Sequence, residues 1–345
     1  MNGFFYQLTP DAVIRAAEEG GLEPTGHCMT LNSFENRVFD LTLEDGSHAV
    51  LKFYRPARWS REQILEEHEF LFDLAADEIP ACAPLRFPDG STLRETEGIF
   101  YTMWPRTGGR QADELTDDEL VVLGRLLARI HNNGAAKPAP HRAVLEPQSF
   151  AHEPLEFLLR NDFLPTHCRD RFENAARRII DIYTTLSAGV PLHRIHGDCH
   201  LGNLLKGRDG WFFLDFDDFL TGPAVQDVWM LLPSRDTESL RQREVFLSSY
   251  RQFRDFDSRW LRLIEPLRAI RYIRYAAWIA RRWNDPAFPK AFPHFGTTQY
   301  WEEETKDLQE QYALIVEESD GGIPNEDPQP DEELSNKDFF WDWDR

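Results

Sequence analysis

Two aspartates and an asparagine near the middle of the chain have the types and spacing of a metal and phosphate site. Asp198 comes five residues before Asn203. A turn at residues 207–210 then leads into a short apolar run that delivers Asp215, and Asp217 follows two residues later. Hard divalent cations such as Mg²⁺ bind carboxylate and amide oxygens, and usually take few protein groups together with substrate phosphates. The pattern therefore predicts oxygen ligands for Mg²⁺ on one loop and one strand end.

The same stretch allows two other interpretations. Asp and Asn are common in ordinary turns, because both side chains bond their own backbone. A zinc site is the second alternative, and four residues have suitable spacing for it: His193, His196, Cys199 and His200. Zinc sites of this kind normally come with a second ligand pair or an open catalytic geometry, and the sequence offers no such pair. We therefore favour Mg²⁺ over zinc.

The segments ahead of this stretch predict a lysine at a fixed place on a β-hairpin. Residues 37–43 alternate apolar and polar side chains, residues 44–47 have the composition of a turn, and residues 49–54 resume the strand pattern. Because strand side chains alternate between faces, Lys52 projects from one defined face of the second strand.

A helix with a carboxylate on its apolar face is expected next. Ser60 and Gln63 have the form of a capping box, which predicts a helix from this point to about Asp73. Four residues of this helix recur at helical spacing and share one face: Ile64, Glu67, His68 and Leu71. A carboxylate within such an apolar stripe needs a partner.

The rest of the chain is dominated by helical patterns. Capping patterns predict helices after Thr9 and Thr116. Further helical segments are expected at residues 153–160, 168–187, 238–254, 258–283 and 299–316. One side of the fourth of these segments carries Arg271, Arg274 and Arg281. These arginines would either meet an acidic substrate or pair with the protein's own acids, and we favour the second interpretation.

The composition indicates a protein with a sizeable core and no disulfide framework. Apolar residues make up 41% of the 345 residues, and the four cysteines form no CxxC pattern. The formal net charge of −21 argues against a nucleic-acid partner, which would need a positive surface. The chain start does not resemble a signal peptide, and no apolar run approaches the about 18 residues of a membrane helix. We expect a cytoplasmic monomer with no membrane partner.

Several stretches together resemble known kinases. His-Gly-Asp at residues 196–198, Asn203, and Asp-Phe-Asp at residues 215–217 resemble the catalytic and metal-binding loops of kinases with the aminoglycoside phosphotransferase and choline kinase fold. Over roughly residues 5–315, the chain is also similar to the bacterial stress response kinase A family. Five stretches carry this second resemblance: residues 31–38, 52–56, 108–110, 222–227 and 285–290.

The resemblance implies an α+β, bilobal protein-kinase-like fold. Residues 1–104 would form a nucleotide-binding N-lobe with an antiparallel β-sheet and one key helix. Residues 105–316 would form a mainly α-helical C-lobe that carries the catalytic and metal loops. Residues 317–345 are rich in acids and prolines, and we expect them to be a disordered tail.

The resemblance also implies the roles of five residues. Asp198 would orient the acceptor hydroxyl or accept its proton, while Asp215 and Asn203 would hold Mg²⁺ against the phosphates of ATP. Lys52 would contact the α- and β-phosphates, and Glu67 would pair with Lys52.

Some assignments depart from the kinase pattern or leave an alternative. Glu66 is the alternative to Glu67 as the partner of the lysine. A G-x-G-x-x-G loop does not occur between the first two strands, and residues 32–36 take its place. Within this loop, Ser33 would offer a hydroxyl to phosphate. Asp217 is a candidate for a second metal ion, and Asp227 would hold the backbone of the catalytic loop.

We therefore expect an ATP- and Mg²⁺-dependent serine/threonine protein kinase of a bacterial stress response, with the chain itself among its candidate acceptors. The main alternative is a small-molecule kinase acting on an aminoglycoside, a choline-like amine or homoserine. A second alternative is a non-catalytic pseudokinase that serves as a binding module. The presence of Asp198, Asn203, Asp215 and Lys52 argues against this last interpretation.

Overall fold

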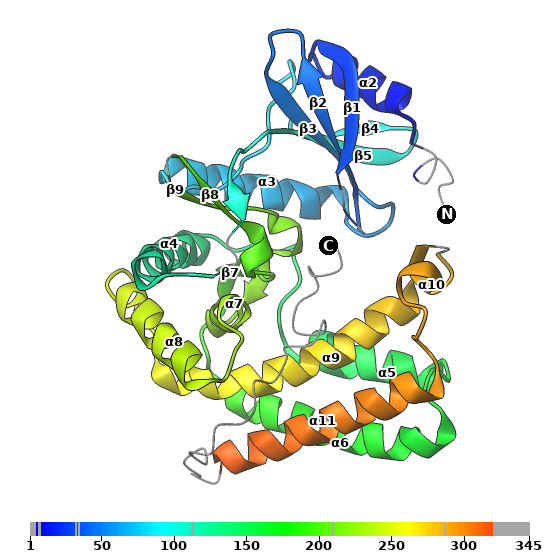
Figure 1. Ribbon diagram of the computed structural model, residues 1–345, viewed down its shortest axis with the longest axis vertical. Helices are drawn as coiled ribbons and strands as arrows, with labels where there is room; N and C mark the ends of the chain where they lie inside the picture. The colour runs from blue at the N-terminus through cyan, green and yellow to red at the C-terminus, as the bar shows by residue number, and fades with distance from the viewer. Residues whose placement is uncertain are drawn as a thin grey trace.

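The structure is a computed structural model that describes residues 5, 8–31, 33, 35–111, 114–208, 210–285 and 287–319. In Figure 1 a twisted β-sheet forms the upper part of the molecule, and a larger, mainly helical part lies below it. The expectations for the tail beyond residue 319, and for residues 32 and 34 of the loop after the first strand, fall outside the described residues. Within the described residues, no helix is long and apolar enough to cross a membrane.

The N-terminal sheet has five antiparallel strands in the order β1-β2-β3-β5-β4. Their bounds are β1 (Pro24–Leu31), β2 (Arg37–Leu43), β3 (His48–Phe53), β4 (Arg94–Thr96) and β5 (Ile99–Pro105). The hairpin predicted from the alternating pattern corresponds to β2 and β3. Lys52 lies in the middle of this sheet, opposite Val38 on β2 and Thr102 on β5. Because its strand has neighbours on both sides, the lysine has a fixed position above the helical part.

Two helices accompany this sheet, and both begin at the predicted caps. Helix α2 (Pro10–Glu19) is capped by the Thr9 side chain, and α3 (Arg61–Ala76) begins with both hydrogen bonds of the capping box between Ser60 and Gln63. The predicted apolar face of α3 is buried, including Glu67, which is 1% exposed. Helix α3 extends three residues beyond the predicted end at Asp73.

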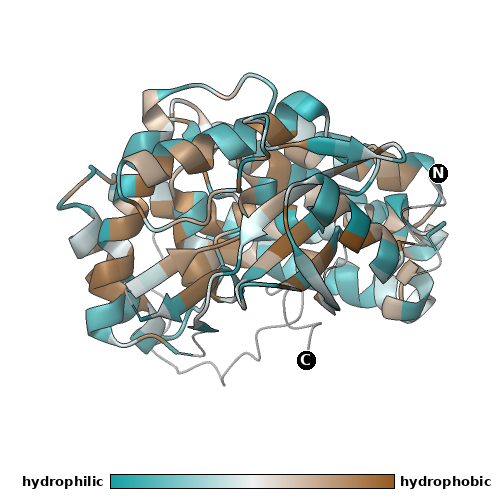
Figure 2. Cartoon of the chain, turned by 90° about the horizontal axis from the view of Figure 1, so that it is seen from above, coloured by the Kyte–Doolittle hydropathy of each residue, from teal (hydrophilic) through white to brown (hydrophobic). Residues whose placement is uncertain are grey.

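The C-terminal part contains the longer helices, and α9 runs through its centre. Besides α9 (Ile264–Arg281), this part contains α4 (Asp117–Ala136), α5 (Glu153–Arg160), α6 (Thr166–Ser187), α7 (Val225–Leu231), α8 (Thr237–Tyr250), α10 (Ala287–Ala291) and α11 (Thr298–Ser319). In Figure 1, α5, α6, α9 and α11 lie together in the lower part of the molecule. Figure 2 shows that hydrophilic and hydrophobic residues alternate within individual helices, as expected where a helix buries one face.

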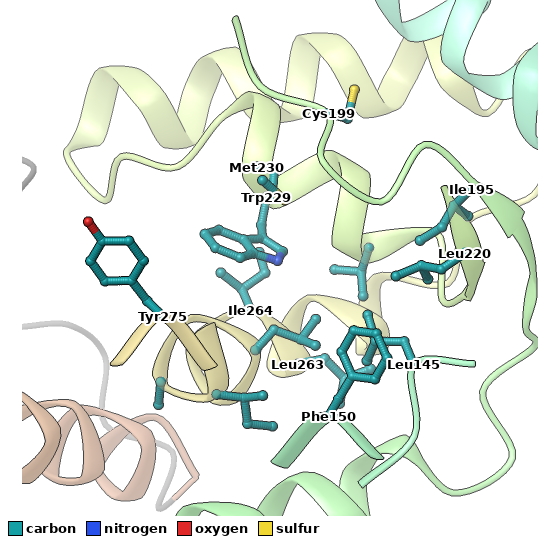
Figure 3. Close-up of a cluster of buried hydrophobic side chains, with 14 of the residues drawn as sticks. Leu145, Phe150, Ile195, Cys199, Leu220, Trp229, Met230, Leu263, Ile264 and Tyr275 are labelled. Atoms are coloured by element: carbon teal, nitrogen blue, oxygen red, sulfur yellow. The ribbon is translucent and has the colours of Figure 1, made fainter. Parts of the chain in front are cut away.

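Helix α9 belongs to the main hydrophobic core. Figure 3 shows part of this core, in which Ile264 and Tyr275 of α9 lie in the same cluster as Phe150 and Trp229. Trp229 is among the largest fully buried side chains of the described residues. This packing makes α9 a rigid support for the polar side chains that it carries on its other face.

One predicted helix is divided in the structure. Residues 258–283 are predicted to be helical, and in the structure residues Ser258–Leu263 form a 3-10 helix before α9 begins at Ile264. Pro266 explains the break, because a proline lacks the N–H of a helix interior and is tolerated only in the first turn. The segment is therefore helical as predicted, but its first six residues are 3-10 and not α-helical.

Candidate active site

Short strands bring the two predicted ligand loops together. Strand β7 (His193–Ile195) pairs antiparallel with β10 (Leu220–Gly222), so the segments next to them lie side by side. Asp198 follows β7, and Asp215 follows β9 (Gly210–Phe213). Both aspartates line one cavity of about 550 Å³.

Two further predicted site residues line this cavity as well. Asn203 ends the short 3-10 helix Leu201–Asn203, and Ser33 belongs to the loop between β1 and β2. Lys52 reaches the same site from β3, through its contact with Asp215. The structure therefore brings together residues that lie far apart in the sequence. Ser33 and Asp215, the first and the last of these five residues, are 182 positions apart.

A buried aspartate holds the loop that carries Asp198. The Asp227 carboxylate accepts hydrogen bonds from the main-chain N–H groups of His196 and Gly197, each at 2.8 Å, and lies 2.9 Å from Nε2 of His131. These are the backbone contacts that the resemblance implies for Asp227. Burial raises the pKa of Asp227 to about 6, although His196 and the two N–H groups favour the charged form.

Glycine is required next to this anchor. Gly197 has a φ of +83°, and a Cβ atom at this position would lie 2.5 Å from the main-chain oxygen of Asp218. A larger residue would be both strained and too close to its neighbour. The loop therefore reaches the cavity in one defined conformation.

Asp198 is surrounded by groups that keep it charged. Its carboxylate lies 3.4 Å from the Arg271 guanidinium and 3.3 Å from Nε2 of His200. Burial raises the pKa of Asp198, but His200, Arg271 and His196 outweigh burial and hold that pKa well below its usual range. An ionised carboxylate can accept a hydrogen bond from an acceptor hydroxyl and so orient it.

Asn203 and Asp215 offer oxygen atoms that fit a shared metal ion. The Asn203 amide nitrogen donates to the main-chain oxygen of Asp198 at 2.9 Å, and among the described residues its Oδ1 atom has no hydrogen-bond donor. The Asp215 side chain is 57% exposed, and only one of its oxygens contacts Lys52. Asp215 also has a φ of +53°, an uncommon left-handed conformation for a residue with a side chain. One carboxylate and one amide oxygen suit Mg²⁺ that takes its other ligands from phosphates and water.

The zinc alternative finds no support in the described part of the chain. No group of three or more His, Cys, Asp or Glu side chains there is arranged to hold a metal ion. His196 Nε2 instead lies 2.8 Å from the main-chain oxygen of Leu214, and the ring of His193 packs 5.0 Å from that of His131. These histidines contribute to packing and to the shape of the loop.

Lys52 contacts three acidic side chains. Its Nζ atom lies 3.0 Å from Asp217, 3.1 Å from Asp215 and 3.9 Å from Glu67. Burial lowers the pKa of Lys52, but these three carboxylates outweigh burial and raise the pKa well above its usual value. The expected contact with Glu67 is present and is the longest of the three. Glu66 points elsewhere and accepts a hydrogen bond from the His141 N–H at 3.1 Å.

Glu67 is the least stabilised of these acids. Neither of its carboxylate oxygens has a hydrogen-bond partner among the described residues. Burial raises the pKa of Glu67 to about 7, and the nearby charge of Lys52 only partly opposes this rise. The glutamate is therefore poised to lose its charge near neutral pH.

Arg58 is a member of the site that sequence reasoning missed. Its guanidinium lies 2.8 Å from Asp217 and 2.8 Å from Asp218, and Asn36 donates a hydrogen bond to Asp217 at 3.2 Å. Burial raises the pKa of Asp217, but Lys52 and Arg58 outweigh it and lower that pKa. Asp217 is thus a buried anchor between the two parts of the molecule. The basic residues at positions 55, 58 and 61 were the only signal in the sequence.

The loop after β1 is tied to helix α9. Ser33 is exposed, and its hydroxyl accepts a hydrogen bond from the Asn36 N–H at 3.2 Å. The Glu35 carboxylate pairs with Arg55 at 3.3 Å and with Arg282, the C-cap of α9, at 2.8 Å. It also accepts a hydrogen bond from Nε1 of Trp278 in α9. The loop that would approach the phosphates is therefore fastened to the same helix that lines the cavity.

The three arginines of α9 differ in their partners. Arg271 pairs with Asp198, as expected for an arginine that meets one of the protein's own acids. Arg274 instead lies over the ring of Phe150 at 3.8 Å, and Arg281 over the ring of Phe157 at 4.9 Å. The expectation that all three pair with acids was therefore wrong for two of them within the described residues.

Comparisons with known proteins show the family of this chain. A family model described as "Phosphotransferase enzyme family" matches residues 28–264. "Stress response kinase A" of Escherichia coli strain K12 is 40% identical over 314 residues, which cover 91% of this chain and 95% of that protein. "Serine/threonine protein kinase RdoA" of Salmonella typhimurium is 39% identical over 318 residues, covering 92% of this chain and 96% of its own.

Solved structures show the same fold at lower identity. An amicoumacin kinase, hAmiN, in complex with AMP-PNP, Ca²⁺ and Ami has a TM-score of 0.70 at 19% identity, covering 90% of this chain and 93% of its own. A choline kinase from Cryptosporidium parvum has a TM-score of 0.57 at 12% identity, covering 92% and 98%. These likenesses confirm the expected α+β kinase-like fold.

Proposed function

Because this chain belongs to the phosphotransferase enzyme family, and within it to the stress response kinase A family, we propose that it transfers the γ-phosphate of ATP to a serine or threonine hydroxyl of a protein in a bacterial stress response. One observation carries this proposal. Asp198, Asn203 and Asp215 line a single cavity, and Lys52 reaches it from the sheet. The names of the relatives support a protein acceptor.

The nucleotide would lie between the sheet and the ligand loops. Lys52 would contact the α- and β-phosphates, and Glu67 would help to hold its ammonium group in place. Ser33 would donate its hydroxyl to a phosphate oxygen. Asp215 and Asn203 would hold Mg²⁺, which when bound would neutralise charge on the phosphates.

The acceptor would lie against Asp198. Its hydroxyl oxygen attacks the γ-phosphorus, the bond from that phosphorus to the bridging oxygen of ADP breaks, and the hydroxyl proton passes to the Asp198 carboxylate. In phosphoryl transfer, the protein mainly positions the reactants and stabilises the charge of the transition state. The charged state of Asp198 and its contact with Arg271 help to position the acceptor hydroxyl.

Transfer of label from γ-labelled ATP tests the proposal. The wild-type chain and Asp198→Ala would be compared with Mg²⁺ and three kinds of acceptor, namely the chain itself, a mixture of proteins, and a panel of small amines and alcohols. Label on serine or threonine that is absent in Asp198→Ala supports the protein kinase. Label only on a small molecule would move the activity to a small-molecule kinase. Nucleotide binding without any transfer would favour a pseudokinase.

A further inference from the structure

Two arginines on the wall of the cavity have no ion-pair partner among the described residues, although Asp218 and Asp198 lie near enough to Arg274 to raise its pKa. Arg274 and Arg281 line the same cavity as Asp198. Among the residues that the structure describes, neither guanidinium group has an ion pair or a hydrogen bond. A guanidinium group offers five N–H donors and stays charged at physiological pH, so two such groups in one cavity form a strong site for an anion.

Aromatic rings hold these side chains in place without neutralising them. Phe150 lies 3.8 Å from the Arg274 guanidinium carbon, measured to the ring centroid, and Phe157 lies 4.9 Å from that of Arg281. A guanidinium over a ring face keeps its N–H groups at its edges, where they can bind a carboxylate or a phosphate. The two cations are therefore ordered before any substrate arrives.

The nearby carboxylates are engaged elsewhere. Asp218 is paired with Arg58 at 2.8 Å, and Asp198 contacts Arg271 and His200. Desolvation by the surrounding protein and the positive charges of Arg271 and Arg281 lower the pKa of Arg274 to about 10, although Asp218 and Asp198 oppose this fall. An anion beside Arg274 would relieve this repulsion, whereas a cation would increase it.

We propose that the acceptor of this kinase carries an anionic group, a carboxylate or a phosphate, within a few residues of its reacting hydroxyl, and that Arg274 or Arg281 binds this group. The inference rests on the proposed function, because it assumes that a serine or threonine of a protein lies against Asp198. To that function it adds that a residue near the phosphorylated serine or threonine carries a negative charge.

The spacing along α9 limits where the anion lies in the substrate. With a rise of about 1.5 Å per residue, Arg274 lies about 4.5 Å and Arg281 about 15 Å along the helix axis from Arg271, which contacts Asp198. An extended peptide advances about 3.3 Å per residue. The anionic residue should therefore lie about one to five positions from the phosphorylated serine or threonine.

The same arginines disfavour cationic acceptors. An aminoglycoside or a choline-like amine would bring positive charge against Arg274 and Arg281. The net charge of the chain is strongly negative, but it does not determine the charge of this cavity wall. Ionic screening limits the reach of distant charges to about 10 Å at 0.1 M salt, so the side chains of the wall dominate there.

A peptide series with the full chain, Mg²⁺ and γ-labelled ATP tests the inference. Each peptide contains one serine and differs at a single position, one to five residues away, that holds Asp, Asn, Lys or phosphoserine. We expect kcat/KM to be about tenfold higher for the Asp or phosphoserine peptide than for the Asn peptide at one of these positions. A higher kcat/KM for the phosphoserine peptide than for the Asp peptide would identify a phosphorylated substrate. Equal kcat/KM values for these two peptides would identify an acidic substrate.

Variants connect this preference to the two arginines. At least one of Arg274→Gln and Arg281→Gln should reduce the preference. At the arginine that carries it, a lysine variant should keep part of the preference and a glutamate variant should shift it toward the Lys peptide. Arg259→Gln is the matched control, because Arg259 is 84% exposed and pairs with Asp257 outside the cavity. Its preference should equal that of the wild type.

The outcomes separate this inference from the proposed function. Transfer to serine peptides without any preference for an anion would overturn the inference and leave the protein kinase intact. The same holds for a preference that survives in Arg274→Gln and Arg281→Gln. Absence of transfer to every peptide and protein, with transfer to a small molecule, would overturn the proposed function and this inference with it.

Discussion

The Nζ atom of Lys52 lies 3.1 Å from Oδ1 of Asp215, which joins the middle of the N-terminal sheet to the end of β9. The lysine has a second contact of 3.0 Å with Asp217, so it is neutralised by carboxylates of the other part of the molecule. Phosphates would compete for the same ammonium group. We infer that the lysine exchanges a carboxylate for a phosphate when nucleotide binds.

The first prediction concerns this exchange. Lys52→Ala should lower kcat/KM for ATP by about 100-fold, the usual loss when one charged donor to the transition state is removed. The comparison is made by steady-state transfer kinetics with ATP as the varied substrate. A buried lysine also supports Asp217, so the melting temperature is measured in parallel to separate lost folding from lost catalysis. An unchanged kcat/KM in a folded variant would show that another group binds the phosphates.

The second prediction concerns Asp198. Asp198→Asn keeps the shape of the side chain but removes the charge that orients the hydroxyl and accepts its proton, so kcat should fall by about 100-fold or more. The affinity for ATP, measured by calorimetry, should change little because Asp198 lies on the acceptor side of the site. A kcat within a factor of about three of the wild type would contradict the assigned role.

The third prediction concerns the metal ligands. Asp215→Ala should abolish transfer and weaken the dependence of nucleotide binding on Mg²⁺, because it removes the one carboxylate of the proposed pair. Calorimetry with ATP at increasing Mg²⁺ measures the change, and Asp257→Ala, an aspartate far from the cavity that caps the 3-10 helix before α9, is the control. Retained transfer in Asp215→Ala would contradict the metal assignment.

Local patterns made part of this site predictable. The capping box at Ser60 and Gln63 depends only on residues three positions apart, so the sequence alone places the helix that carries Glu67. Alternation along a strand places Lys52 on one face in the same way. The pairing of Arg58 with Asp217 joins residues 159 positions apart and leaves no periodic trace, so it could be found only from the structure.

Two features were not predicted from the sequence, for different reasons. One is the 3-10 helix before α9, and the other is the position of Arg274 and Arg281 over aromatic rings. A proline is tolerated in the first turn of an α-helix, so Pro266 indicates that the α-helical part of this segment begins only shortly before it. The partners of Arg274 and Arg281 depend on which rings of α5 and its preceding turn lie opposite α9. Such contacts between helices have no signature within either helix alone.

The fourth prediction follows from the pKa of Glu67. An unfolded glutamate has a pKa near 4.5, and burial raises it to about 7 in the folded chain. Between these values the folded state binds more protons than the unfolded state, so the contribution of Glu67 to stability falls as the pH rises. Glu67→Gln stays neutral throughout. As the pH rises from 4.5 to 8, we therefore expect the free energy of unfolding of Glu67→Gln to increase by about 1–3 kcal/mol relative to that of the wild type.

Urea unfolding at several pH values measures this difference for the nucleotide-free chain. Comparison with the glutamine variant isolates Glu67 from the buried histidines, whose neutral state makes the protein less stable at acid pH in both chains. A difference between the two chains that does not change with pH would show that Lys52 keeps Glu67 charged throughout.

The fifth prediction concerns the anchor of the catalytic loop. Asp227→Ala leaves the main-chain N–H groups of His196 and Gly197 without their acceptor, and each unsatisfied buried donor costs about 1–3 kcal/mol. The free energy of unfolding should therefore fall by about 2–5 kcal/mol, measured by urea titration. Asp257→Ala removes a half-exposed cap of a 3-10 helix instead and should cost clearly less. Equal losses in the two variants would contradict the anchoring role, because the loop would then hold its conformation without Asp227.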